Sequence, residues 1–133
     1  MNFVGLVAAL SAFLGIWFGH VAVRKIEFVS PTIWLPRAVF AALGILTEGL
    51  SLITDNWLLN TASGILGIIL LFGAFEFTRQ QRRVRRGHAP ANPNNPRHAV
   101  LLADPDSNAT TLNLLQREPV GHSGGWQTSV KRN

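Results

Sequence analysis

The chain has 133 residues, a formal net charge of +5 and no cysteine. Its length predicts a single folding unit, and the lack of cysteine excludes disulfides, thiolate metal sites and cysteine nucleophiles. Residues 1–77 hold three cations and four acids, whereas residues 78–133 hold nine cations and three acids. We therefore expect an apolar domain over residues 1–87 and a basic tail over residues 88–133.

The first apolar segment, residues 2–23, contains no charged side chain. As a helix rising ~1.5 Å per residue it extends about 33 Å, enough to cross a hydrocarbon core of ~30 Å. No positive charge precedes the segment, so we interpret it as a retained membrane helix and not as a cleaved signal peptide. Ser11, Gly15 and Gly19 recur at four-residue spacing and predict a face on which another helix packs closely.

A linker and a shorter apolar segment follow. The linker, residues 24–37, contains Pro31 and Pro36, which prevent one continuous helix there. The second span, residues 38–53, is short for a bilayer and includes Glu48, so we expect it to tilt or to be shielded by neighbouring helices.

The third span, residues 57–77, follows the second after only three residues. A connection this short predicts an antiparallel helical hairpin. Ser63 and Gly67 are the predicted helix-packing residues of this span. Nothing in residues 78–86 breaks a helix, so we expect the third helix to continue to Gly87, a natural stop.

The tail begins with three prolines and three asparagines in residues 88–96. We expect it to be extended, with little regular structure apart from a short helix over residues 109–117. The predicted fold is therefore an all-α membrane protein with three transmembrane helices, the third reaching into the cytoplasm, followed by this tail.

Cations lie on only one side of the three spans. The first linker is basic, the second linker carries only Asp55, and arginines follow the third span. This charge bias predicts a multi-pass protein of the bacterial cytoplasmic (inner) membrane, with the N-terminus outside and the C-terminus cytoplasmic. The same cations predict contacts with anionic lipid head groups or with a protein partner. The candidate binding residues are Arg24, Lys25, Arg79, Arg82, Arg83, Arg86 and, as the only large anchor near the end, Trp126. Aromatic residues do not interleave with the arginines, so we expect no nucleic-acid partner.

Three ionisable side chains lie within the spans: His20, Glu48 and Glu76. Glu48 is interpreted either as a proton or cation site or as a carboxyl group that is hydrogen-bonded to a neighbouring helix or lies near the outer interface. His20 has the chemistry to ligate haem or a chlorophyll magnesium or to relay protons, but it is a single histidine. Glu76 is within reach of Arg79 or Gln80 on the same helix. The sequence contains no phosphate-binding glycine loop, paired carboxylates, metal-spaced histidines or nucleophile elbow, so we expect no enzymatic activity, cofactor or metal site.

Two stretches resemble a known family. Residues 19–28 read GHVAVRKIEF and precede Trp34, and Glu76 precedes residues 81–93, QRRVRRGHAPANP. Together with residues 2–6 they are similar to the small bacterial integral membrane proteins of domain-of-unknown-function family 4491, over roughly residues 1–97. Val21 stands where the family tends to have proline, and His88 and Ala89 replace an aromatic pair. The resemblance implies three membrane helices and no assigned activity, with both motifs at the cytoplasmic boundary.

The leading hypothesis is a non-catalytic accessory subunit of a larger membrane protein complex, docking through helix packing and its basic tail. One alternative is a small oligomeric transporter or channel that uses Glu48, with or without His20. Another is a subunit of an electron-transfer or photosynthetic complex that binds a cofactor through His20. Residues 24–28 beside residues 76–93 are the expected working surface, with the tail leading from it to a partner.

Overall fold

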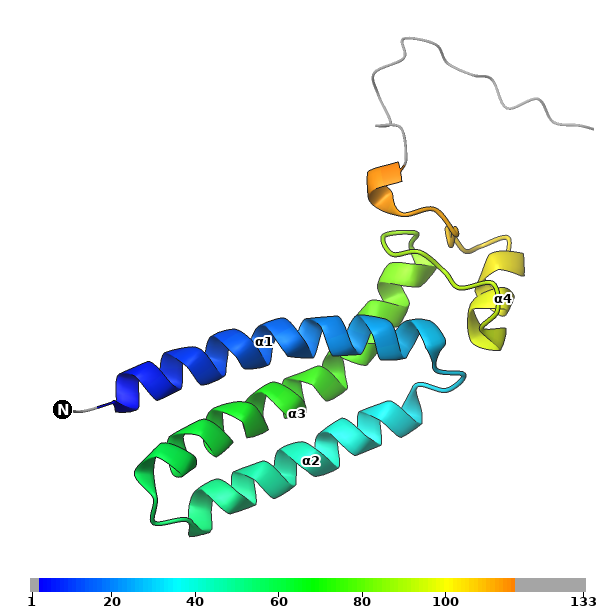
Figure 1. The fold of residues 1–133 in the computed structure, drawn as a ribbon. Coiled ribbons are helices and arrows are strands. Elements are labelled where there is room, and N and C mark those ends of the chain that lie inside the picture. Colours follow the sequence, from blue (N-terminus) through cyan, green and yellow to red (C-terminus); the bar gives the residue numbers. More distant parts are fainter. Residues whose placement is uncertain (1–2, 117–133) are drawn as a thin grey trace, which may run out of the picture.

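The structure is a computed structural model that describes residues 3–116 (Figure 1). This part of the chain contains α1 (Val4–Val29), α2 (Trp34–Ile53), α3 (Trp57–Arg85), α4 (Pro96–Ala103) and the short 3-10 helix η1 (Leu114–Gln116). The first three helices are long and apolar enough to cross a membrane. This confirms the all-α fold with three candidate membrane helices. Trp126, predicted as an anchor, lies outside the described residues.

The first two helices are longer than their apolar segments. α1 continues six residues past Val23, to Val29, and ends at Ser30, which has extended backbone angles and precedes Pro31. Residues before proline favour the extended region, which accounts for the stop. Pro36 is the third residue of α2, in the first turn, where a backbone N–H has no intrahelical partner. α2 therefore has 20 residues, four more than its apolar segment.

Capping interactions define both ends of α3. The Asn56 side chain accepts hydrogen bonds from the backbone N–H groups of Leu58 and Leu59. At the other end Gly87 has a φ of 72°, a left-handed conformation that favours glycine. Gly87 N–H donates to Val84 O and His88 N–H donates to Arg83 O, the two bonds of a Schellman motif. The predicted extension of the helix to Gly87 is confirmed.

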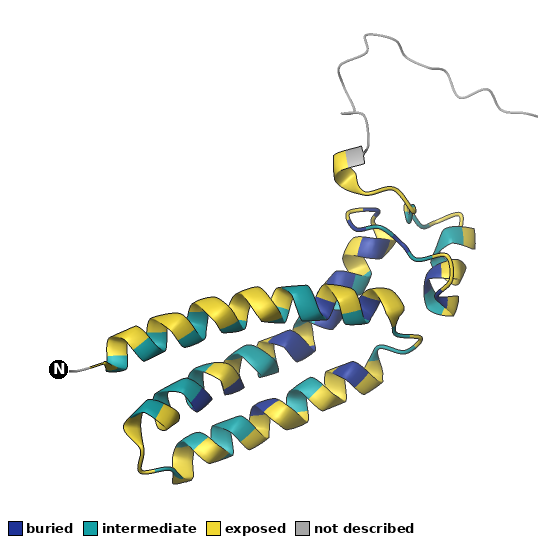
Figure 2. Ribbon diagram, in the orientation of Figure 1, coloured by how far each residue is buried: buried dark blue, intermediate teal, exposed yellow. Residues whose placement is uncertain are grey.

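The three long helices form an open layer with α3 in the middle (Figure 1). α1 and α2 each pack along α3. Their other faces are largely exposed (Figure 2), and α1 buries only Val23 and Glu27. Helices with such apolar exposed faces require lipid or another protein chain around them.

Glycines allow α2 and α3 to approach closely. A Cβ on Gly44 would lie 2.7 Å from Leu71 Cγ and 3.0 Å from the backbone oxygen of Gly67. A Cβ on Gly73 would lie 2.7 Å from the ring of Phe40, which also makes an edge-to-face contact with Phe77. The hairpin is thus held by small residues facing large ones.

Residues 88–116 fold back onto the ends of α1 and α3, and we call this segment the cap. Its small core joins Val84 of α3 to Ala89 and Ala91, with Leu101 and Leu102 of α4 packed beside them. The cap has little regular structure apart from α4 and η1, and residues 109–113 are not helical. α4 forms because Asn95 caps its first turn and Pro96 takes its first position.

Candidate functional site

Two segments far apart in the sequence meet at the arginine-rich end of the layer, which we call the basic end. One segment is the end of α1 with Ser30, and the other runs from the end of α3 into α4. Asn92 Nδ2 donates a hydrogen bond to Phe28 O at 3.1 Å, and Asn95 Nδ2 donates to the same oxygen at 3.1 Å. The structure therefore places the two motif segments side by side.

A buried ion pair connects these segments. Glu27, near the end of α1, is 1% exposed, and its Oε1 accepts a hydrogen bond from Arg97 Nη1 at 2.9 Å. Arg97 Nη2 donates to Glu27 O at 2.7 Å, so one guanidinium group holds both the side chain and the backbone of Glu27. The Arg97 side chain is only 14% exposed, so solvent screens the pair weakly. Removing either partner would leave a charge buried without its counterion.

His98 completes this cluster. Its side chain is fully buried, with Nε2 at 3.0 Å from Glu27 Oε1 and Nδ1 accepting a hydrogen bond from Asn92 N–H at 2.9 Å. A nitrogen that accepts a hydrogen bond carries no proton, so Nε2 bears the hydrogen donated to Glu27. Both ring nitrogens are committed to the fold, and neither is free to act on a substrate.

Asparagine amides satisfy the carbonyl groups at the end of α1. The last carbonyls of a helix have no intrahelical donor. Asn95 Nδ2 donates to Phe28 O and to Ser30 O, while Asn95 Oδ1 accepts from Arg97 N–H and caps α4. Asn95 is 2% exposed, and its side chain thus binds carbonyl groups at the end of α1 and caps the start of α4.

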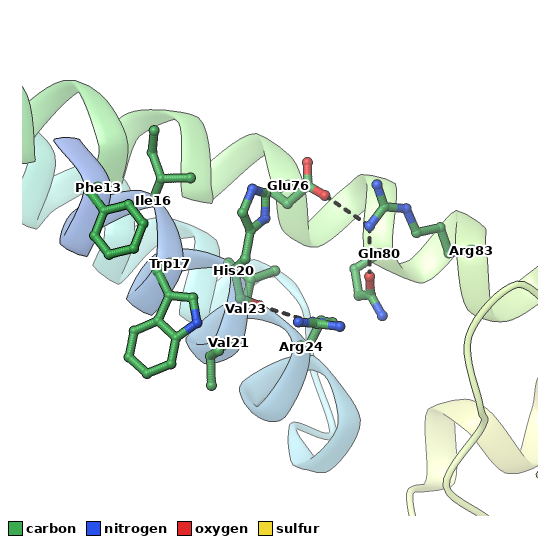
Figure 3. Close-up of a pocket in the computed structure, with 10 residues that line it drawn as sticks. All are labelled: Phe13, Ile16, Trp17, His20, Val21, Val23, Arg24, Glu76, Gln80 and Arg83. Carbon is green, nitrogen blue, oxygen red and sulfur yellow. Dashed lines mark hydrogen bonds and ion pairs between the residues drawn. The ribbon is translucent and has the colours of Figure 1, made fainter. Parts of the chain in front are cut away.

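Two adjoining pockets lie along α1 and α3 at the basic end. The first, about 480 Å³, extends from apolar residues of α1 such as Trp17 to Arg24 and Arg83 (Figure 3). The second, about 890 Å³, lies between the end of α1, the end of α3 and the cap, with Phe28, Pro90 and Leu114 among its walls. Val21, Arg24, Gln80 and Arg83 line both pockets. We call the two pockets together the α1–α3 groove.

Glu76 organises the arginines beside this groove. Arg83 Nη1 lies 3.4 Å from Glu76 Oε1, an ion-pair distance without hydrogen-bond geometry, and Arg79 Nη1 lies 3.9 Å from Oε2. The arginines are 52% and 71% exposed, and the carboxylate is 15% exposed. Glu76 therefore restrains two exposed guanidinium groups near the basic end. His20 lines the first pocket with Glu76, and also a third, smaller pocket on α1 and α3.

The other predicted site residues lie on several different surfaces of the protein. Arg24, Lys25, Arg82 and Arg86 are exposed at the basic end. A Cβ on Gly15 would lie 2.7 Å from Ile69 Cδ1, and one on Gly19 would lie 3.6 Å from Ile69 Cγ2, so α3 of the same chain covers these glycines. Ser11 is partly buried on α1. Ser63 is buried and donates to Leu59 O at 2.7 Å.

Glu48 is separate from His20 and Glu76. It packs against α3 at Gly67, where a Cβ would lie 2.8 Å from Glu48 Oε1. This oxygen is buried and has no hydrogen-bond partner among the described residues. Gly67 and Glu76 are nine residues apart on α3, about 14 Å along a helix. One chain therefore does not combine Glu48 and His20 into a single relay. Within residues 3–116, no three His, Asp or Glu side chains are arranged to hold a metal ion.

Sequence reasoning missed the residues that fix the cap: Asn95, Arg97 and His98. Glu27 was part of a quoted motif, but no role was inferred for it. The available signal was the position of Glu27, one helical turn after Val23 on the face toward α3. An acid on a buried face requires a partner. Its partners lie about 70 residues further along the chain, and no local pattern identifies them.

Comparison with known proteins identifies a family. Residues 2–95 match the family described as "Domain of unknown function (DUF4491)". The match covers more than half of the chain, so the chain belongs to this family. No curated protein and no solved structure matches the chain. The matched region ends at Asn95, and Arg97 and His98 lie just beyond it.

Proposed function

We propose that this DUF4491 protein is a non-catalytic accessory subunit of a larger membrane protein complex. In this proposal the three long helices span the cytoplasmic membrane of a bacterium, with the N-terminus outside and the cap in the cytoplasm. The open layer packs against other subunits or lipid, and the cap contributes the cytoplasmic docking surface. The charge bias of the connections supports this orientation.

The observation that carries the proposal is the cap, which is fixed to α1 by buried polar contacts and yet presents apolar side chains outward. Val100 is 69% exposed and Leu115 is 93% exposed, and neither belongs to a candidate membrane span. Leu112 and Leu114 are each about half exposed beside Leu115. Exposed apolar side chains on a segment outside the candidate membrane spans are typical of a protein interface.

The polar groups at the basic end support a structural role for the buried cluster. Glu27, Arg97 and His98 bind one another and the neighbouring backbone, although Arg97 Nε has no hydrogen-bond partner among the described residues. A general base must reach a proton on a substrate. Neither nitrogen of the fully buried His98 does so, which favours docking over chemistry at this cluster.

Purification of the full chain in mild detergent tests the proposal. We expect a particle that contains a second polypeptide in fixed stoichiometry, measured by size-exclusion chromatography with light scattering. Leu115→Glu places a charge on the docking surface and should release that polypeptide, whereas Thr111→Glu, at an exposed polar position nearby, should not. A monodisperse monomer of the unaltered chain would overturn the proposal.

An oligomeric transporter or channel is the second candidate. The buried Oε1 of Glu48, without a hydrogen-bond partner among the described residues, favours it. A carboxyl group held among membrane helices is a common site for protons or cations. Proton flux into liposomes that Glu48→Gln abolishes would support this function, and flux unaffected by Glu48→Gln would exclude Glu48 as its site.

A further inference from the structure

The α1–α3 groove combines an apolar half with a basic half, and this division matches one class of ligand. The apolar half is formed by Phe13, Ile16 and Trp17, whose side chains are 69%, 51% and 55% exposed. The polar half is formed by Arg24, Gln80 and Arg83 (Figure 3). The groove thus changes from apolar to cationic along its length.

The dimensions of the groove agree with one leaflet of a bilayer. Phe13 and Arg24 are eleven residues apart on α1, about 16 Å along the helix axis. Half of a hydrocarbon core of ~30 Å is about 15 Å. An acyl chain lying along Phe13 and Trp17 would therefore bring its head group to Arg24.

The charges at the polar half agree with a phosphodiester. Arg24 and Arg83 contribute two positive charges and Glu76 one negative charge, so the three groups together carry +1. Within residues 3–116 no carboxylate pairs with Arg24, whose Nε donates only a long hydrogen bond of 3.4 Å to His20 O. Glu76 lies beside Arg83 and restrains it at the groove. Guanidinium groups bind phosphate oxygens well because their donors match the geometry of the anion.

From these observations we infer that the α1–α3 groove binds an anionic glycerophospholipid. An acyl chain lies along Phe13, Ile16 and Trp17, and the phosphate contacts Arg24 and Arg83, with Lys25 beside them in the adjoining pocket. This site requires no partner subunit, so it does not depend on the proposed function. Binding at this site also differs from a general attraction of anionic lipid to the whole basic end, because it depends on Arg24 and Arg83 and not on the other arginines.

Fluorescence quenching in bilayers tests this assignment. The full chain with Trp34, Trp57 and Trp126 replaced by phenylalanine keeps Trp17 as its only tryptophan. The variant is placed in mixed bilayers in which either phosphatidylglycerol or phosphatidylcholine carries bromine on its acyl chains. We expect brominated phosphatidylglycerol to occupy the site beside Trp17 about fivefold more favourably than phosphatidylcholine.

A pair of double variants separates the groove from the general charge of the basic end. Arg24→Gln with Arg83→Gln should reduce the preference to about one, whereas Arg82→Gln with Arg86→Gln removes the same charge outside the groove and should retain it. Equal quenching by the two lipids, or equal loss of preference in both double variants, would overturn the inference. Native mass spectrometry of the chain with all its tryptophans, from detergent micelles that contain the same two lipids, gives an independent measurement. Phosphatidylglycerol that stays bound to the unaltered chain and is lost from the Arg24→Gln, Arg83→Gln variant supports the site. If neither lipid is retained selectively, the inference is overturned.

Discussion

Glu27→Gln should weaken the attachment of the cap to α1. The substitution keeps the shape of the side chain but removes the charge that Arg97 Nη1 contacts at 2.9 Å. Breaking a buried ion pair by altering one partner typically costs about 3–5 kcal/mol, because the other charge stays buried. Arg97 is 14% exposed and keeps its bond to Glu27 O, so we expect the lower value, about 3 kcal/mol.

Thiol labelling measures this loss directly. The chain has no cysteine, and Ala91, which is 2% exposed in the small core of the cap, can be replaced by cysteine as a single reporter. When opening is fast and reversible, the labelling rate is proportional to the open fraction. A loss of about 3 kcal/mol in the free energy of opening should raise the labelling rate about 150-fold, since 1.4 kcal/mol corresponds to a factor of ten.

Asp104→Asn is the matched control, because it also changes a carboxylate of the cap to an amide and breaks an ion pair with an arginine. Arg85 Nη2 lies 3.8 Å from Asp104 Oδ2, and the two side chains are 59% and 30% exposed. Exposed pairs contribute about 0–1 kcal/mol, so the labelling rate should rise no more than about fivefold. A rise of less than about tenfold for Glu27→Gln would refute the reasoning, as would equal rises in the two variants.

The remaining predictions concern helix packing, the asparagine contacts and the carboxyl group between α2 and α3. Gly44→Ala should lower the thermal stability of the detergent-solubilised chain, because its Cβ would lie 2.7 Å from a leucine of α3, whereas Gly49→Ala, with nothing within 4 Å, should leave it unchanged or raise it. Asn95→Ala should raise labelling of the same cysteine reporter at least tenfold, because the change removes the hydrogen bonds from Asn95 to Phe28 O and Ser30 O and the side-chain cap of α4. Asn94→Ala, at an exposed position, should change the rate by less than about threefold, and similar rates for the two would contradict the assigned contacts. Glu48→Leu removes a buried oxygen without a hydrogen-bond partner among the described residues. The free energy of unfolding should therefore stay equal or rise by up to about 2 kcal/mol. A marked decrease would show that this oxygen has a partner.

Much of the fold follows from local sequence features. The apolar lengths predicted three long helices, the three-residue connection predicted the hairpin, and Gly87 predicted the end of α3. The ends of α1 and α2 were less predictable. Arg24 and Lys25 were assigned to a linker because of their charge, yet α1 continues through them to Val29. Charge determines how deep a residue sits in a membrane, but it does not end a helix.

The sequence predicted where the candidate site lies, but not which residues form it. The two motif segments were expected to form a common surface, and they lie side by side. The small residues Gly15 and Gly19 were predicted to receive another helix, but the sequence did not indicate that this helix is α3 of the same chain. The prediction of a helix over residues 109–117 was wrong: residues 109–113 are not helical, and only residues 114–116 form the short η1. The structure instead forms α4 earlier, where Asn95 caps it.

The sequence by itself determined the number of apolar helices, their lengths and the asymmetry of charge, because each depends on residues adjacent in the chain. Only the tertiary structure decided which polar residues are buried. Glu27 and Arg83 are both charged residues near the basic end, yet one is 1% exposed in an ion pair and the other is half exposed beside a groove. The difference arises because Arg97 and His98, about 70 residues away in sequence, reach Glu27 when the cap folds back. The burial of a charge depends on partners from distant segments, and those partners meet only in the folded chain.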